Sequence, residues 1–145
     1  MGGIEEPAAV YAAYNDAENA KDFPVMAALV SANLRVEVNG RVAVASADED
    51  QRAMLELFRT YPDYRREIEE IVVAGDRATV RWRMRGTVGT AGIAGIAGID
   101  GIDGIAPLDV SGCSVVGVRG GRLTHAFLYY DGAALDGVLA RAGAT

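Results

Sequence analysis

The feature that most constrains the fold is a strict two-residue alternation over residues 77–88. Arginines occupy one set of alternate positions, and small or apolar side chains occupy the other (Arg77, Arg81, Arg83 and Arg85 against Ala78, Val80, Trp82, Met84 and Gly86). Because successive side chains of a strand point to opposite faces, this pattern predicts a strand with one face on the core. We expect the arginines on a solvated outer face or in a dimer contact. Trp82 and Met84 are expected in the core or in the wall of a pocket.

Other periodic segments surround this strand. Helices are predicted at residues 8–20, 24–30, 49–61 and 135–142, and further strands at residues 34–38, 66–73, 108–119 and 122–131. Helices come mainly before antiparallel strands, an order typical of an α+β fold with helices packed on one side of a curved sheet. A chain of 145 residues is long enough for one core, so we expect a single domain over residues 1–145.

The last predicted strand ends in a carboxylate. Ideal alternation places five of its side chains on one face: Leu123, His125, Phe127, Tyr129 and Asp131. A carboxylate held against apolar walls resists ionisation, so Asp131 could donate a proton or orient a hydrogen-bond partner. The alternative is a structural role in which Asp131 caps the helix that begins at residues 132–134. We expect His125 to pack among aromatic rings rather than to act as a catalyst.

Composition and charge exclude several classes of function. Hydrophobic residues make up 50% of the chain and charged residues 23%, as is usual in globular proteins. The formal net charge of −6 argues against nucleic acid or an anionic membrane as a partner. With one cysteine, Cys113, and one histidine, the chain can form no internal disulfide and offers no ordinary zinc site. Residues 1–7 lack the pattern of a signal peptide, and no apolar stretch is long enough to span a membrane, so we expect a cytoplasmic protein.

Two hairpins are predicted, one with its turn at residues 74–76 and one with its turn at Gly120-Gly121, and a glycine-isoleucine repeat separates them. Five triplets that each begin with Gly-Ile run from Gly92 to Ala106. Glycine at this density is unfavourable to order in a helix or strand, so residues 89–106 are predicted to form a long flexible loop. The loop is either an inert insertion or a lid whose isoleucines close over an apolar ligand.

Taken in order, short motifs along the chain resemble those of a known family. They are VYAAYN at 10–15, DF at 22–23, YPDY at 61–64, GDRATVRW at 75–82, RGT at 85–87, GRL at 121–123 and YYD at 129–131. This set resembles the SnoaL-like polyketide cyclases of the nuclear-transport-factor-2-like (NTF2-like) superfamily. The resemblance implies a cone-shaped barrel in which helices pack on a curved, mostly antiparallel sheet around an apolar cavity. It also implies a homodimer that takes a small-molecule polyketide substrate and needs no metal and no organic cofactor.

The resemblance also implies a chemistry. Family members close rings in polyketides, commonly by an intramolecular aldol step in which a strand-end acid moves a proton, and Asp131 matches that acid. Many members carry a histidine after the motif at 85–87, where this chain has Val88. The usual acid–base partner of the strand-end acid is therefore missing.

Within the family, the Gly-Ile repeat is similar to that of cyclases that close an indane ring in a linear polyene, formally a (4+2) cycloaddition. Such a reaction needs no proton transfer, but it needs the substrate to be held folded in a cavity. The side chains expected to bind the substrate are Tyr14, Leu29, Phe58, Trp82, Met84, His125 and Phe127. A hydrogen bond from Tyr129 or from protonated Asp131 to a conjugated carbonyl would polarise the alkene.

Three other functions stay open at this point. In an aldol-type cyclase, Asp131 would carry the chemistry and the rate would follow the titration of one carboxyl group. An epoxide hydrolase would need a second carboxylate to activate water, and Asp109 is the candidate. A binding module would hold a small molecule tightly without turning it over.

Overall fold

The computed structural model describes residues 2–88 and 106–143. The helices and strands follow one another as α1 (Gly2–Asn19), α2 (Phe23–Ala28), β1 (Val30–Val38), β2 (Arg41–Val44), α3 (Ala47–Thr60), β3 (Arg65–Ala74), β4 (Arg77–Gly86), β5 (Leu108–Arg119), β6 (Arg122–Tyr130) and α4 (Ala133–Gly143). Most of the loop predicted at residues 89–106 lies outside the described residues. None of the helices in the described part of the chain has both the length and the hydropathy that a membrane crossing requires.

The strands of the described residues form one mixed sheet in the order β2-β1-β6-β5-β4-β3. Strand β1 runs parallel to β6, and every other neighbouring pair is antiparallel. The predicted α+β class and the curved, mostly antiparallel sheet are confirmed. The sheet is not closed among the described strands, because β2 and β3 lie at its opposite edges and do not pair. The concave side of the sheet is covered by helices.

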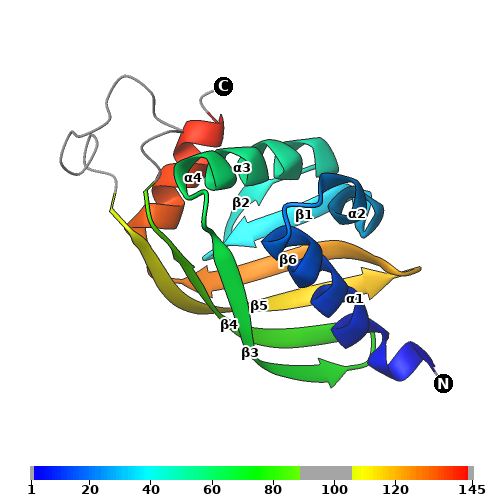
Figure 1. Cartoon of the computed structure of the whole chain (residues 1–145). Helices are drawn as coiled ribbons and strands as arrows, with labels where there is room; N and C mark the ends of the chain where they lie inside the picture. Colours follow the sequence, from blue (N-terminus) through cyan, green and yellow to red (C-terminus); the bar gives the residue numbers. More distant parts are fainter. Residues whose placement is uncertain (1, 89–105, 144–145) are drawn as a thin grey trace.

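The helices gather on one face of the sheet (Figure 1). Helix α1 packs mainly on β3, and α3 packs against α4 and β1. The start of α3 follows from local chemistry, since Ser46 Oγ accepts a hydrogen bond of 3.2 Å from the backbone N–H of Glu49. Such a cap satisfies an N–H group that the first turn of a helix leaves free. The concave face of the sheet and the helices above it therefore enclose the core.

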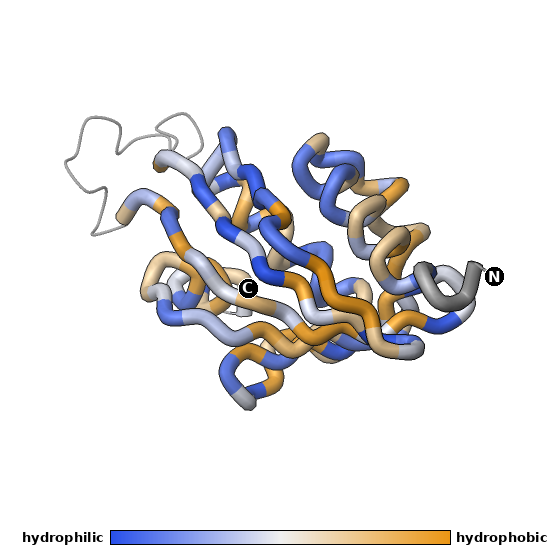
Figure 2. Tube along the Cα trace, turned by 90° about the horizontal axis from the view of Figure 1, so that it is seen from below, coloured by the Kyte–Doolittle hydropathy of each residue, from blue (hydrophilic) through white to orange (hydrophobic). Residues whose placement is uncertain are grey.

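The alternation of β4 holds along its whole length. Val80 and Trp82 face the core and are fully buried. On the other face, Arg83 forms two hydrogen bonds of 2.8 Å with the carboxylate of Asp109 on β5. Figure 2 shows how hydrophobic and hydrophilic residues alternate along the strands. The arginine row lies on the outer face of the sheet, as predicted.

Strand β6 departs from ideal alternation at Thr124. Its pairing with β5 joins His125 to Gly117 but Leu123 to Val118, so Thr124 is one extra residue on β6. An extra residue of this kind is a β-bulge. Because side chains alternate with a period of two, the bulge moves every later side chain to the opposite face.

The bulge overturns the predicted shared face of the last strand. Leu123 lies before the bulge and is buried in the core, whereas Tyr129 lies after it and is 48% exposed. The core-facing positions of β6 after the bulge belong to other residues, namely Ala126, Leu128 and Tyr130. The prediction that residues 123, 125, 127, 129 and 131 share one face of the strand is therefore wrong.

Two aromatic rings meet over a glycine on the inner face of the sheet. Gly112 on β5 pairs with Trp82 on β4 and with Tyr130 on β6, and the centroids of the two rings are 6.1 Å apart. A Cβ atom at Gly112 would lie 2.7 Å from Cη2 of Trp82 and 2.8 Å from Cβ of Tyr130. Carbon atoms pack at about 3.5–4.0 Å, so only glycine lets both rings lie here.

We predict that Gly112→Ala destabilises the fold by about 1–3 kcal/mol, because the added methyl group overpacks the core at Trp82. Denaturant unfolding followed by the fluorescence of Trp82, the single tryptophan of the chain, measures this directly. Gly143→Ala serves as the control, since a Cβ atom there meets nothing within 4 Å. Equal unfolding free energies for the two variants would contradict the packing argument.

Candidate active site

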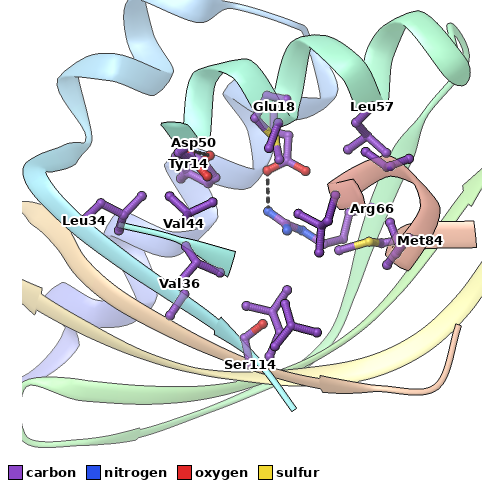
Figure 3. Close-up of a pocket in the computed structure, with 18 of the residues that line it drawn as sticks. Tyr14, Glu18, Leu34, Val36, Val44, Asp50, Leu57, Arg66, Met84 and Ser114 are labelled. Carbon is purple, nitrogen blue, oxygen red and sulfur yellow. Dashed lines mark hydrogen bonds and ion pairs between the residues drawn. The ribbon is translucent and has the colours of Figure 1, made fainter. Parts of the chain in front are cut away.

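A cavity lies between the concave face of the sheet and helices α1, α3 and α4 (Figure 3). Most of its wall is aliphatic and includes Leu34, Val36, Val44, Leu57, Met84 and Leu128. Its volume is about 100 Å³, room for roughly three water molecules at about 30 Å³ each. A largely apolar wall with a few polar groups is the usual lining of a small-molecule site.

Polar side chains gather at one part of this cavity. Helix α1 contributes Tyr11, Tyr14 and Glu18, which are spaced by three and four residues and so lie on one stripe of the helix. Asp50 from α3 and Arg66 from β3 complete the group. The cavity therefore combines an apolar wall with a compact polar end.

Tyr14 and Met84 line the cavity, as expected for substrate-binding residues. Three other expected residues lie outside its wall. Leu29 packs against the core, and the ring of Phe58 meets the ring of Phe23 edge to face at 5.6 Å. Trp82 is fully buried and donates its Nε1–H to Ser114 Oγ at 2.8 Å. None of these three residues belongs to the lining of the cavity.

The expected residues of the last strand lie on the other side of the sheet. The rings of His125 and Phe127 stack there with centroids 4.8 Å apart. Tyr129 is half exposed, and Asp131 is exposed just beyond the end of β6. The bulge at Thr124 explains the placement of His125, Phe127 and Tyr129. Catalytic roles for Asp131 and Tyr129 stay predictions that the geometry does not favour, because neither lines the cavity.

Asp109 lies on the outer face as well. Both of its oxygens accept hydrogen bonds from Arg83, and this guanidinium holds the pKa of Asp109 below its ordinary value. Asp109 therefore does not supply a second carboxylate to the cavity. Within residues 2–88 and 106–143, no three side chains of His, Cys, Asp or Glu come together as a metal site requires.

Tyr14 and Asp50 form a hydrogen-bonded pair at the polar end. Tyr14 Oη donates to Asp50 Oδ2 at 3.0 Å, from α1 to α3. Burial raises the pKa of Asp50 to about 6, and the nearby Glu18 carboxylate adds to this rise. Burial also raises the pKa of Tyr14 well above its ordinary value, so Tyr14 remains a protonated donor. Asp50 is thus a carboxyl group that gains or loses its proton near neutral pH, as a general acid or base must.

A buried ion pair supports this end of the cavity. Arg66 Nη2 donates to Glu18 Oε1 at 2.9 Å, the contact drawn as a dashed line in Figure 3. The Tyr64 hydroxyl donates to the other oxygen of Glu18, and Arg66 Nε donates to Asn15 Oδ1 at 2.7 Å. Burial opposes the charge of Arg66, but Glu18 together with Tyr11, Tyr64 and Tyr14 outweighs burial and holds the pKa of Arg66 above its ordinary value. The guanidinium of Arg66 therefore stays charged inside the protein.

Sequence reasoning missed Asp50, Glu18 and Arg66. Asp50 lies in an acidic first helical turn, where carboxylates usually serve the helix dipole. A signal for the others was present, since Glu18 falls on the same helical stripe as Tyr11 and Tyr14. A charged group on the stripe that packs inward needs a buried partner, and Arg66 supplies it.

Comparisons with known proteins agree with this architecture. A search of curated proteins found no match. A candidate SnoaL-like polyketide cyclase from Jannaschia sp. CCS1 superposes with a TM-score of 0.70 at 16% identity, over 96% of this chain and 94% of that chain. A candidate ketosteroid isomerase from Kribbella flavida DSM 17836 gives 0.65 at 18% identity, over 90% and 81%. A candidate polyketide cyclase from Sinorhizobium meliloti gives 0.60 at 18% identity, over 83% and 93%.

Identities this low establish a shared fold and nothing more. The family is established separately, by a model described as the SnoaL-like domain that matches residues 11–126. The matched range begins at Tyr11 on α1, includes Tyr14, Asp50 and Arg66, and ends within β6. It therefore spans most of the chain together with the polar end of the cavity. On this match, the protein belongs to the SnoaL-like family.

Proposed function

We propose that this protein is a polyketide cyclase that closes a carbocycle in a linear substrate with its own side chains. The observation that carries this proposal is the Tyr14–Asp50 pair at the polar end of an otherwise apolar cavity. Membership of the SnoaL-like family and the likeness of the fold to candidate polyketide cyclases support it. An apolar cavity keeps water from a reactive carbanion, and the carboxyl group moves the proton that ring closure requires.

In the proposed reaction, the Asp50 carboxylate removes a proton from a carbon next to a substrate carbonyl. The resulting enolate carbon attacks a second carbonyl carbon of the same chain, which forms the new C–C bond and leaves an alkoxide. The alkoxide takes the proton back from Asp50, so the product is an isomer of the substrate and Asp50 is again a carboxylate. Tyr14 holds Oδ2 of Asp50 and so leaves Oδ1 as the atom that exchanges the proton.

The aliphatic walls of the cavity favour a second candidate reaction. Indane formation by a formal (4+2) cycloaddition forms two C–C bonds and moves no proton. Holding diene and alkene in contact can lower a barrier by up to roughly 7–11 kcal/mol, and an apolar enclosure can supply such confinement. This reaction would use the wall around Met84 and Leu34 and would not depend on the ionisation of Asp50.

The pH dependence of the rate separates the two reactions. If Asp50 is the base, kcat/KM should rise about tenfold per pH unit as the pH increases toward about 6 and should level off above it. The reason is that the active form is the carboxylate, whose fraction grows with pH. Initial rates with a linear polyketide substrate measured across this range test the expectation. A profile that is flat through pH 6 would instead support the cycloaddition.

A pair of matched carboxylate variants tests the identity of the acid–base group. Asp50→Asn should lower turnover roughly 10²- to 10⁴-fold, because the amide cannot accept the proton. Asp131→Asn is the control and should keep nearly the wild-type rate, since Asp131 is exposed outside the cavity. The product is identified by mass spectrometry and NMR as an isomer of unchanged mass that bears a new ring.

The ranking of the two variants decides between the remaining functions. A loss of turnover in Asp131→Asn alone would assign the proton transfer to Asp131. Nearly full turnover in both variants would favour cycloaddition by confinement. Tight binding of the polyketide with no product from the wild type would indicate a binding module.

We also propose a homodimer that forms through the outer face of the sheet. This face exposes Tyr129 and Val72 and carries the half-buried Phe127, which provides apolar surface for a second copy. Sedimentation should give twice the mass of the 15.2 kDa chain at micromolar concentration. Phe127→Glu should shift the protein toward the monomer, because it places a charge in the proposed contact. A monomeric wild type would contradict this assembly.

A further inference from the structure

One hydroxyl group in the cavity lacks a hydrogen-bond partner. Tyr11 lines the cavity from α1 and is 3% exposed, and its buried Oη makes no hydrogen bond with any described residue. The other tyrosine hydroxyls of the cavity wall are each paired, Tyr14 with Asp50, Tyr64 with Glu18 and Tyr130 with Asp136. Because buried polar groups are nearly always hydrogen-bonded, the Tyr11 hydroxyl indicates a place for a ligand atom.

The groups around Tyr11 show what kind of atom fits. The guanidinium carbon of Arg66 lies 5.1 Å from the centre of the Tyr11 ring. The Ser114 hydroxyl is close enough to lower the pKa of Tyr11, although Tyr11 Oη has no hydrogen-bond partner among the described residues. Arg66 and Ser114 lower the pKa of Tyr11, but burial, with a smaller contribution from Glu18, outweighs them and raises it. The hydroxyl of Tyr11 therefore stays protonated and can donate. A donor beside a buried cation suits an oxygen atom that carries or develops negative charge.

We propose that Tyr11, with Arg66 and Ser114 beside it, binds one oxygen atom of the substrate, a ketone or enolate oxygen on an otherwise apolar, planar group. Tyr11 donates a hydrogen bond to this oxygen, and the guanidinium of Arg66 stabilises its negative charge. The substrate class is therefore an enolisable carbonyl compound, since a plain hydrocarbon polyene would leave Tyr11 unpaired. This assignment rests on the proposed cyclase function and names the group that the cyclase recognises.

The oxygen site and the acid–base pair belong to the same end of the cavity. Arg66 and Glu18 each influence the pKa of Tyr11 and also that of Asp50. The charges of the Glu18–Arg66 pair therefore act on both Tyr11 and Asp50. A carbonyl oxygen held by Tyr11 brings the neighbouring carbon to the end of the cavity where Asp50 exchanges its proton.

The test compares two bicyclic ligands of nearly equal shape, 2-naphthol and naphthalene. Equilibrium dialysis followed by ligand fluorescence gives both affinities. The wild type should bind 2-naphthol about threefold to tenfold more tightly, since one buried hydrogen bond is gained. Tyr11→Phe should bind the two ligands about equally. Tyr61→Phe is the matched control and should keep the preference, because Tyr61 lies outside the cavity wall and its hydroxyl donates to the backbone carbonyl of Ala106.

A second measurement needs no variant and so does not depend on how Tyr11→Phe folds. The absorption spectrum of 2-naphthol bound to the wild type reports whether its oxygen accepts a hydrogen bond. The spectrum should differ from that of 2-naphthol in an apolar solvent, because Tyr11 donates to the oxygen, whereas a purely apolar pocket would give the same spectrum. Equal affinities in the wild type, a preference kept by Tyr11→Phe, or an unshifted spectrum of bound 2-naphthol would each overturn the oxygen site.

These outcomes are independent of turnover. A naphthol preference without any cyclisation would keep the oxygen site and remove the proposed cyclase function. Cyclisation without the preference would keep the cyclase function and remove the oxygen site.

Discussion

The buried ion pair between Glu18 and Arg66 is the interaction on which the rest of the site depends. It joins α1 to β3 through side chains that are almost completely buried, and Tyr64 and Asn15 satisfy further hydrogen-bonding positions of the pair. Removing one partner from such a pair generally costs about 3–5 kcal/mol, because the other charge is left uncompensated in the interior. The pair therefore fixes how α1 lies over the sheet, and α1 carries Tyr11 and Tyr14.

This arrangement divides the cavity into two chemically different parts. Aliphatic side chains from the sheet, α3 and α4 form most of the wall and supply confinement without polarity. The polar end holds one ion pair and one carboxyl group, Asp50, whose pKa of about 6 follows mainly from burial. Burial is the largest influence on the pKa of both Asp50 and Tyr11, ahead of the charges of Glu18 and Arg66. A cavity of this kind can hold an apolar chain and still exchange a proton with it.

The predictability of the fold differs from element to element for physical reasons. Strand β4 was predictable because its alternation is regular and both of its neighbours in the sheet continue the pattern. The Gly120-Gly121 hairpin was predictable because both residues adopt positive φ, which glycine accommodates readily. Strand β2 was missed, since its four residues are mostly exposed and carry no periodic signal. The parallel pairing of β1 with β6 joins segments far apart in the chain, which no local pattern reports.

The sequence by itself determined the α+β class, the order of the elements and the resemblance to the SnoaL-like family, because hydrophobic periods, caps and turn residues act over a few neighbouring positions. Only the tertiary structure decided which side chains meet in the cavity. One extra residue at Thr124 turns Tyr129 away from the cavity, because strand side chains alternate with a period of two. The contact between Tyr14 and Asp50 spans 36 residues of sequence and exists only because α1 and α3 pack over the same sheet.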